Sequence, residues 1–317
     1  MAIAASGAVS FSDLRSEFVG GSSAISYSDL YRGGSNIRAK AANNTSVNLA
    51  ASVPTSGAIN MTNFRSQAKG FRFTFSATAT DQNASALFGS DYGVNYPKEI
   101  VIDSGVELGA TSTSEEALEI DTGGVGTITV TNNGTLSGAG GGVGAAGGDA
   151  FEAAVNCAFV NNGTVRAGGG GGGTGGNGSY SSTVPSGGGR CWDASTNQAN
   201  ANSSCVQQGK TYCRSGSYGG CGGDRMSCFY CYTTSYYTSS GGSGGVGAGY
   251  NQSVGSGSSG GSNAGTGGAG GAFGTSGSTG TNGNSSNGSA GGSAGKYLRG
   301  LSFVTFTNNG TAQGGTA

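Results

Sequence analysis

Residues that could do chemistry gather in one stretch of this sequence, residues 179–240. Six of the seven cysteines lie there: Cys191, Cys205, Cys213, Cys221, Cys228 and Cys231. Six cysteines in a segment too short to build a core favour three disulfides and an oxidising environment, with the pairing left open. The seventh, Cys157, lies beside Phe159 in a strand-like segment, and we expect it to be a buried thiol.

A cysteine-only zinc site is the alternative for this stretch. It would use Cys213, Cys221 and the pair Cys228-x-x-Cys231. A single C-x-x-C pair with irregularly spaced partners is a weak zinc signal, because zinc ribbons carry two such pairs. We therefore favour disulfides and expect neither a metal nor a cofactor.

The same stretch is rich in aromatic residues. It holds the one tryptophan and seven of the 13 tyrosines. Tyrosine and tryptophan on loops offer a large contact area and a polar tip at low entropic cost, and they also stack on sugar rings. These rings could instead pack a small core of the insert, but the clustering favours a binding surface. The candidate contact residues are Tyr180, Trp192, Tyr212, Tyr218, Phe229, Tyr230, Tyr232, Tyr236 and Tyr237.

Composition argues against several other classes of function. Fifteen basic and 16 acidic residues give a net charge of −1, which argues against a nucleic-acid partner. Histidine is absent and the acids are sparse and scattered, so we expect no enzyme and no paired carboxylates of a glycan depolymerase. No apolar run is long enough to span a membrane, and the N-terminus does not resemble a signal peptide.

Three related segments lie within the N-terminal residues 1–70, and they begin at Ser6, Ser22 and Ser56. Each predicts an extended piece that feeds one or two helical turns, with Ser12, Ser28 and Thr62 as N-caps. Leu14, Leu30 and Phe64 are expected to turn inward and are the candidate docking residues. Units this small cannot bury a core alone, so we expect residues 1–70 to dock on other subunits.

A compact β domain is predicted for residues 71–136, because Phe71, Phe73 and Phe75 alternate as in a half-buried strand. A strand followed by Asn-Asn-Gly-Thr ends this domain at 129–138 and recurs at 158–168 and, after a long insertion, at 304–314. We expect the three strands to lie side by side, with 304–314 returning to the domain and the intervening residues projecting outward.

The distal region, residues 137–317, repeats glycine every third residue. The longest run has glycine at 265, 268, 271, 274, 277, 280 and 283. This period is that of a polyproline-II-type helix, and collagen is excluded because the chain has only three prolines. We expect a bundle of polyglycine-II helices rather than a flexible linker, because a linker needs no fixed phase. Such a bundle can form within one chain or as a homotrimer.

The N-terminal segments and the passage EIVIDSGVELGATSTSEEALEIDTGGVGTITVTNNGTLSGAGGGVG together resemble tail proteins of tailed bacteriophages. The glycine runs with aromatic loops resemble phage receptor-binding adhesins that carry a polyglycine-II sandwich. The insert at 179–240 matches no family that we can name.

The resemblance implies a tail-fibre or tail-tip protein of the virion, made in the host cytoplasm. Its fold would be mainly β plus irregular structure. Residues 1–70 would bind other tail subunits, and the distal loops would bind a bacterial surface glycan or outer-membrane protein. The alternative is a structural tip component that braces a neighbouring subunit without host contact.

Overall fold

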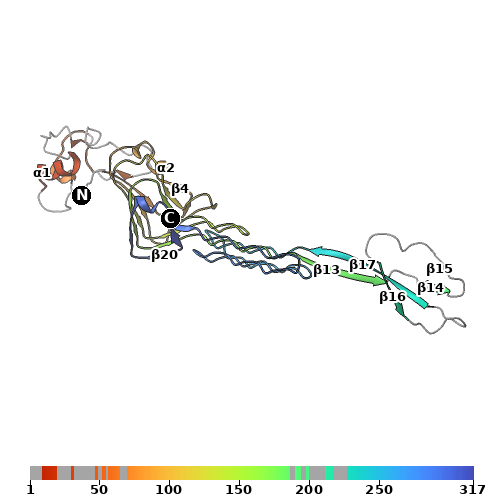
Figure 1. Cartoon of the computed structure of the whole chain (residues 1–317). Coiled ribbons are helices and arrows are strands. Elements are labelled where there is room, and N and C mark those ends of the chain that lie inside the picture. Colours follow the sequence, from red (N-terminus) through yellow and green to blue (C-terminus); the bar gives the residue numbers. More distant parts are fainter. Residues whose placement is uncertain are drawn as a thin grey trace.

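The computed structural model describes residues 9–19, 30–31, 47–48, 52–54, 56–64, 70–185, 190–193, 198–199, 211–216 and 227–317. The molecule is elongated (Figure 1). The helix α1 near the N-terminus lies at one end, a β-rich body follows, and a slender glycine-rich region leads to a β-ribbon at the other end.

The helical elements are short. They are α1 (Phe11–Leu14), η1 (Arg15–Val19), η3 (Met61–Phe64), α2 (Ala84–Phe88), η4 (Gly89–Asp91) and η5 (Leu301–Phe303). No helix in the described part of the chain combines the length and apolar character that crossing a membrane requires.

Most regular structure is strand. The strands up to residue 166 are β1 (Val47–Asn48), β2 (Phe71–Phe75), β3 (Ala79–Thr80), β4 (Gln82–Asn83), β5 (Lys98–Ile102), β6 (Glu107–Gly109), β7 (Leu118–Ile120), β8 (Ile128–Asn132), β9 (Thr135–Ser137), β10 (Phe151–Ala153), β11 (Cys157–Asn161) and β12 (Thr164–Arg166). The later strands are β13 (Gly178–Pro185), β14 (Arg190–Asp193), β15 (Gln198–Ala199), β16 (Thr211–Gly216), β17 (Ser227–Ser239), β18 (Lys296–Leu298), β19 (Val304–Asn308), β20 (Thr311–Gln313) and β21 (Gly315–Thr316).

The β-rich body is a parallel β-helix with three faces. One face is the sheet β1-β2-β5-β8-β11-β19, the second is β20-β12-β9-β6-β3, and the third is β10-β7-β4. A bridge between Glu152 and Arg299, and the pairing of β18 with β21, continue the third face. The repeated strands β8, β11 and β19 lie side by side in parallel, as their sequences predict.

Alternating side chains explain why these strands coil around one core. In β5, β8 and β11 every second residue is buried, which is the pattern of a strand with one face inward. Phe151 and Phe159 stack inside the helix with ring centroids 4.4 Å apart, and Phe306 continues the row at 5.3 Å. The protein is therefore mainly β, as predicted. The three sheets that contain strands from residues 71–136 also take strands from residues 47–48, 151–166 and 304–313.

The glycine-rich segments leave the β-helix at one corner. Residues 138–150 connect β9 to β10, and residues 167–295 connect β12 to β18. Both connections join the second face to the third, so the long insertions project from the same edge of the β-helix (Figure 1). A repeated turn of the β-helix thus fixes where the distal region begins.

Backbone hydrogen bonds hold the glycine-rich segments together. Every N–H group from Gly169 to Asn177 donates to another segment at 2.7–3.0 Å. Gly169, Gly172 and Gly175 donate to residues 242–248, whereas Gly170, Gly173 and Gly176 donate to residues 275–281. In these two sets of donors the partner segment therefore recurs every third residue. In the third set, Gly171 donates to the Ala145 carbonyl oxygen, whereas Thr174 and Asn177 donate to the hydroxyl groups of Ser289 and Ser286.

The N-terminal segments pack on one another. Leu14, Leu30 and Phe64 are fully buried in one cluster with Phe18 and Val53. Helix α1 is capped by Ser10, whose hydroxyl accepts from the Asp13 N–H at 3.2 Å while its own N–H donates to the Asp13 carboxylate at 2.7 Å.

The predicted N-cap at Ser12 is wrong, because the capping box of Ser10 and Asp13 starts the helix earlier and places Ser12 inside it. Thr62 likewise lies inside a helical turn, η3. Ser28 is outside the described residues.

Candidate functional site

An antiparallel ribbon of β13 and β17 leads from the glycine-rich region toward the far end of the molecule, where β14, β15 and β16 join the same sheet (Figure 1). Tyr180 lies opposite Tyr237 across the ribbon, and their rings stack with centroids 5.2 Å apart and planes at 21°. Tyr236 pairs with Ser181, so it lies on the other face of the ribbon, because neighbouring residues in a strand alternate faces.

These three tyrosines are open to solvent. Tyr180 is 39% exposed, Tyr237 is 46% exposed and Tyr236 is 71% exposed. A stacked pair of exposed rings offers a flat apolar face bordered by hydroxyl groups, which suits sugar rings or extended peptides. The ribbon thus presents aromatic contact surface on both of its faces.

Asparagine side chains fix the ribbon to the glycine-rich region. The Asn284 carboxamide accepts from the Ser179 N–H at 2.7 Å and donates to the Ser179 carbonyl oxygen at 2.8 Å. Asn263, which has a φ of 60°, donates to the same carbonyl oxygen at 3.1 Å, and the Asn177 carboxamide accepts from the Gly241 N–H at 3.2 Å. Sequence reasoning missed this anchor, although asparagine at three breaks in the glycine pattern was a usable signal.

The other predicted contact residues fall where side chains are not described. Trp192 lies in β14, Tyr212 in β16, and Phe229, Tyr230 and Tyr232 in β17. Tyr218 lies outside the described residues altogether. The backbone nevertheless brings β14 and β16 against β17, so these five aromatic positions belong to the same sheet as Tyr180, Tyr236 and Tyr237.

The predicted disulfide cysteines divide in the same way. Cys191, Cys213, Cys228 and Cys231 lie in strands whose side chains are not described, and Cys205 and Cys221 lie outside the described residues. Cys157 is a free, buried thiol, as predicted, and burial raises its pKa to about 12.

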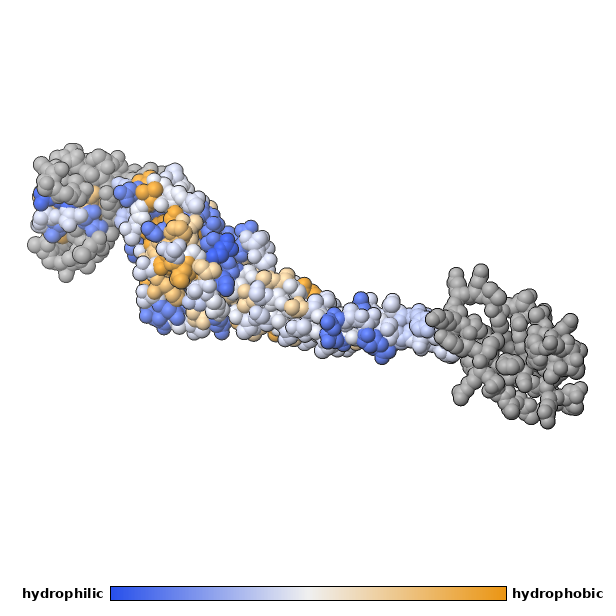
Figure 2. All heavy atoms as spheres, in the orientation of Figure 1, coloured by the Kyte–Doolittle hydropathy of each residue, from blue (hydrophilic) through white to orange (hydrophobic). Residues whose placement is uncertain are grey.

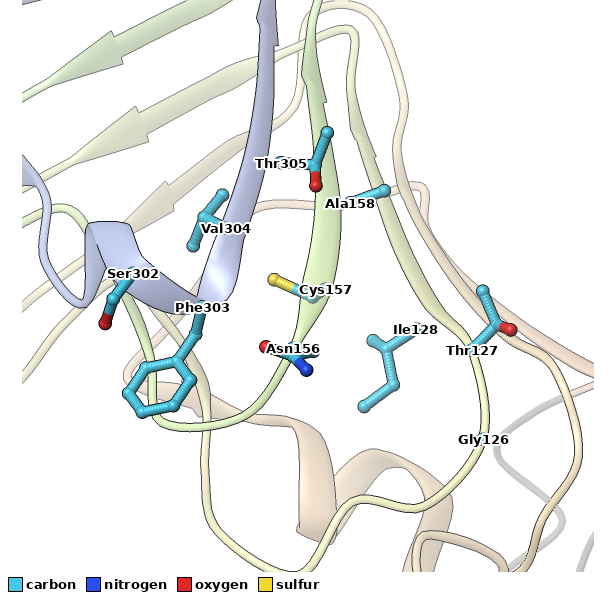
Figure 3. A pocket seen from close by; sticks show the side chains of 10 residues that line it. All are labelled: Gly126, Thr127, Ile128, Asn156, Cys157, Ala158, Ser302, Phe303, Val304 and Thr305. Atoms are coloured by element: carbon cyan, nitrogen blue, oxygen red, sulfur yellow. The ribbon is translucent and has the colours of Figure 1, made fainter.

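A hollow of about 430 Å³ lies far from the ribbon, where β8, β11 and β19 begin. Figure 3 shows the Cys157 thiol pointing into it beside Ile128, with the Phe303 ring at its rim. A thiol with so high a pKa is a poor nucleophile at neutral pH, because the thiolate is the reactive form. Cys157 is therefore a poor candidate for a nucleophile.

A charged cluster lies on the third face of the β-helix, beside the start and end of the glycine-rich insertions. Arg299 contacts the carboxylates of Glu152 at 2.9 Å, Asp149 at 3.2 Å and Glu116 at 3.4 Å. Burial, followed by the neighbouring Glu152 charge, raises the pKa of Glu116 to about 7. Arg299 lies among these carboxylates and ties the returning chain to the β-helix.

The predicted docking residues are not surface residues. Leu14, Leu30 and Phe64 have no exposed area, so they support the N-terminal region from inside. Any contact with another subunit must therefore use the surface that this small core holds in place.

Comparison with known proteins defines the class. Residues 70–227, about half of the chain, match the family model described as phage tail fibre adhesin Gp38. The chain is therefore a phage tail-fibre or tail-tip protein. The matched region is similar to the Gp38 adhesin family and comprises strands β2 to β12 of the β-helix, the first glycine-rich segments and much of the insert.

One solved structure is similar in shape. It is the crystal structure of the gp37-gp38 adhesin tip complex of the bacteriophage S16 long tail fiber, at 17% sequence identity and a TM-score of 0.42. The similarity covers 83% of this chain and 88% of that chain. No curated protein matches the chain.

Proposed function

We propose that this protein is the host-binding adhesin of a phage tail fibre and that its distal ribbon and insert contact the bacterial surface. The exposed Tyr180–Tyr237 stack carries the proposal, because tyrosine rings offer a large and rigid contact area of the kind that is enriched in binding surfaces. The ligand would be a surface glycan or an outer-membrane protein. The match to a family of tail fibre adhesins supports the same role.

A rigid stalk is the second part of the proposal. We interpret the glycine-rich segments as polyglycine-II helices, because their hydrogen-bond partners recur every third residue and the chain lacks the proline of collagen. Disulfides in the insert would add rigidity at the tip. A contact surface that is ordered before binding loses less entropy when it meets its ligand.

The third part of the proposal concerns attachment. Residues 1–70 would bind another tail subunit through the outer surface of their own small core. Deleting residues 1–69 is expected to abolish incorporation into particles, while the isolated truncated chain still binds host cells. Incorporation of the truncated chain at the normal level would contradict this assignment.

A triple variant tests host binding. Tyr180→Ala, Tyr236→Ala and Tyr237→Ala together are expected to lower the affinity of the purified chain for host cells at least about tenfold, since each removed aromatic contact is worth roughly 1 kcal/mol. The fold should survive because all three side chains are exposed. Thr183→Ala is the matched control, because Thr183 lies on the same ribbon and is exposed but offers no ring.

The opposite outcome favours the structural alternative. If both the triple variant and a chain lacking residues 179–240 adsorb to host cells like the wild type, the distal end is not the host contact. The protein would then be a structural tip component that braces a neighbouring subunit.

A further inference from the structure

Four cysteines of the insert fall into two direct cross-strand pairs. Cys191 in β14 lies opposite Cys228 in β17, and Cys213 in β16 lies opposite Cys231 in the same central strand. Directly opposed residues of an antiparallel pair have Cα atoms about 4.5–5.5 Å apart, which lies inside the range of about 4.4–6.8 Å for disulfides.

We propose that Cys191 bonds to Cys228 and Cys213 bonds to Cys231, so that β17 is covalently joined to a strand on each of its edges. This inference concerns the chemistry of the cysteines and holds whether or not the insert contacts the host. It assigns a pairing that the cysteine spacing alone leaves open.

The extended backbone of β17 excludes the nearest alternatives. Cys228 and Cys231 are three residues apart in one strand, so their Cα atoms are separated by about 10 Å at the usual rise of about 3.3 Å per residue. That distance exceeds the reach of a disulfide. The same extension also separates them too far to act as a compact C-x-x-C knuckle for zinc.

The two pairs lie on different edges and different faces of β17. Strand β16 pairs with residues 228–233 and overlaps the pairing regions of both β13 and β14, so β16 must occupy the opposite edge. Positions 228 and 231 differ by an odd number, which places them on opposite faces of the strand. Each edge of β17 therefore carries one bond, and the two bonds lie on opposite faces of the strand.

The same alternation sorts the aromatic positions. Tyr230, Tyr232 and Tyr236 share a face of β17 with Cys228, whereas Phe229 and Tyr237 share the face of Cys231. Each bond thus lies on a face that also carries aromatic positions. Fixing the strands would fix the spacing of those positions.

Each bond forms by two exchange steps with a low-molecular-weight disulfide such as oxidised glutathione. A cysteine thiolate attacks that disulfide and releases one small thiol, leaving a mixed disulfide. The opposed thiolate then attacks the protein sulfur of the mixed disulfide and releases the second small thiol. The protein loses two electrons and two protons per bond, and the small disulfide gains them as two thiols.

Peptide mapping of the full chain tests the pairing. The chain is equilibrated with oxidised glutathione, free thiols are alkylated, and the protein is digested without reduction by trypsin and chymotrypsin. Cleavage at Arg190, Trp192, Lys210, Tyr212, Arg214, Arg225, Phe229, Tyr230 and Tyr232 separates all six insert cysteines. We expect the fragment 191–192 linked to 226–229, and the fragment 213–214 linked to 231–232.

A single variant gives an independent readout. Cys191→Ser is expected to leave one new thiol, and the alkylation label gained relative to the wild type should map to Cys228 alone while the link between Cys213 and Cys231 persists. Any other partner for these four cysteines, four free thiols after oxidation, or stoichiometric zinc bound by them would overturn the proposal. None of these outcomes depends on host binding, so failure here leaves the adhesin proposal to its own test.

Discussion

The β-helix and the glycine-rich region are both ordered, but different kinds of contact stabilise them. The β-helix buries side chains such as Phe151, Phe159 and Ile100 in one continuous cluster. No residue from the described part of 168–295 belongs to that cluster. Figure 2 shows the same difference on the surface, with apolar colour gathered over the β-helix and a paler glycine-rich region. Order therefore rests on side chains in one region and on backbone contacts in the other.

The spacing of glycine along a segment indicates how many neighbouring segments it contacts closely. The central segment has glycine at all of residues 168–173, and a Cβ added at successive positions would meet backbone from different neighbouring segments. Outer segments meet fewer neighbours, and between their glycines they carry serine, threonine, alanine or asparagine at positions such as Ser276 and Thr279. Glycine at every third residue thus indicates close contact on one side of a segment, and consecutive glycines indicate close contact on all sides.

The largest effect is expected in the side-chain core. Phe159→Ala removes a fully buried ring that contacts both Phe151 and Phe306, and it should lower the free energy of unfolding of the β-helix by about 3–5 kcal/mol. Denaturant unfolding measures the loss. Phe303→Ala is the control, because that ring is 42% exposed and its removal should cost about 0.5 kcal/mol or less. Equal losses for the two variants would show that the ring row is not what stabilises the β-helix.

In the glycine-rich region a single methyl group should be enough to disturb the structure. Gly171→Ala directs a Cβ into the Gly142 carbonyl group, so the two segments must separate, at a cost of about 1–3 kcal/mol for overpacking. Amide hydrogen exchange should rise across residues 138–148 and 168–177 and stay unchanged in the β-helix.

The matched control for this variant is its own neighbour. A Cβ at Gly142 meets no atom within 4 Å, so Gly142→Ala should leave exchange in both segments as in the wild type. If Gly171→Ala also leaves exchange unchanged, close backbone packing does not hold this region together.

The sequence predicted those parts of the fold that carry a recognisable local sequence pattern. The Asn-Asn-Gly-Thr repeat predicted the neighbours β8, β11 and β19 because a repeated turn of the chain stacks on itself. The closing third face was not predicted, since β4, β7 and β10 are only two or three residues long and carry little periodicity. Side chains alternate too briefly there for a sequence pattern to appear.

The candidate site was predicted by residue type but not by arrangement. Tyrosine enrichment identified Tyr180, Tyr236 and Tyr237, yet their faces depend on the register of β13 against β17, which is set by contacts between residues 47 to 61 positions apart. The anchoring asparagines Asn177, Asn263 and Asn284 were missed for the same reason. Their partners come from segments that only the fold brings together.

An asparagine ladder crosses β8, β11 and β19 in the β-helix, and its members Asn132 and Asn161 are buried. Asn132 donates to the Asn161 carboxamide at 2.8 Å, and Asn161 donates to that of Asn308 at 2.7 Å and to the Thr311 carbonyl oxygen at 3.1 Å. Asn161→Ala should lower the free energy of unfolding by about 1–2 kcal/mol, since buried polar groups lose partners.

A parallel ladder on the outside supplies the control for that variant. Asn162 donates to the Asn133 carboxamide at 3.0 Å but is exposed. Water can replace its partner, so Asn162→Ala should cost about 0.5 kcal/mol or less. A cost for Asn162→Ala that matches the cost for Asn161→Ala would mean that burial does not set the value of the ladder.

The smallest expected effect lies at the junction of the two regions and depends on pH. Burial and the Glu152 charge hold the pKa of Glu116 near 7 in the folded protein, above its ordinary value of 4.5, while Arg299 offsets part of the rise. Between these values the folded chain keeps a proton that the unfolded chain releases, so stability should fall as pH rises from about 4.5 to about 7. Glu116→Gln removes this titration and should flatten the profile by about 1 kcal/mol, a modest amount because water screens a partly exposed carboxyl group.

The control variant is Glu115→Gln, at an exposed neighbouring position, and it should leave the profile as steep as in the wild type. Thermal unfolding of the three proteins between pH 4.5 and 7.5 measures the slopes. If Glu116→Gln keeps the wild-type slope, another carboxyl group in the cluster around Arg299 is the one that titrates.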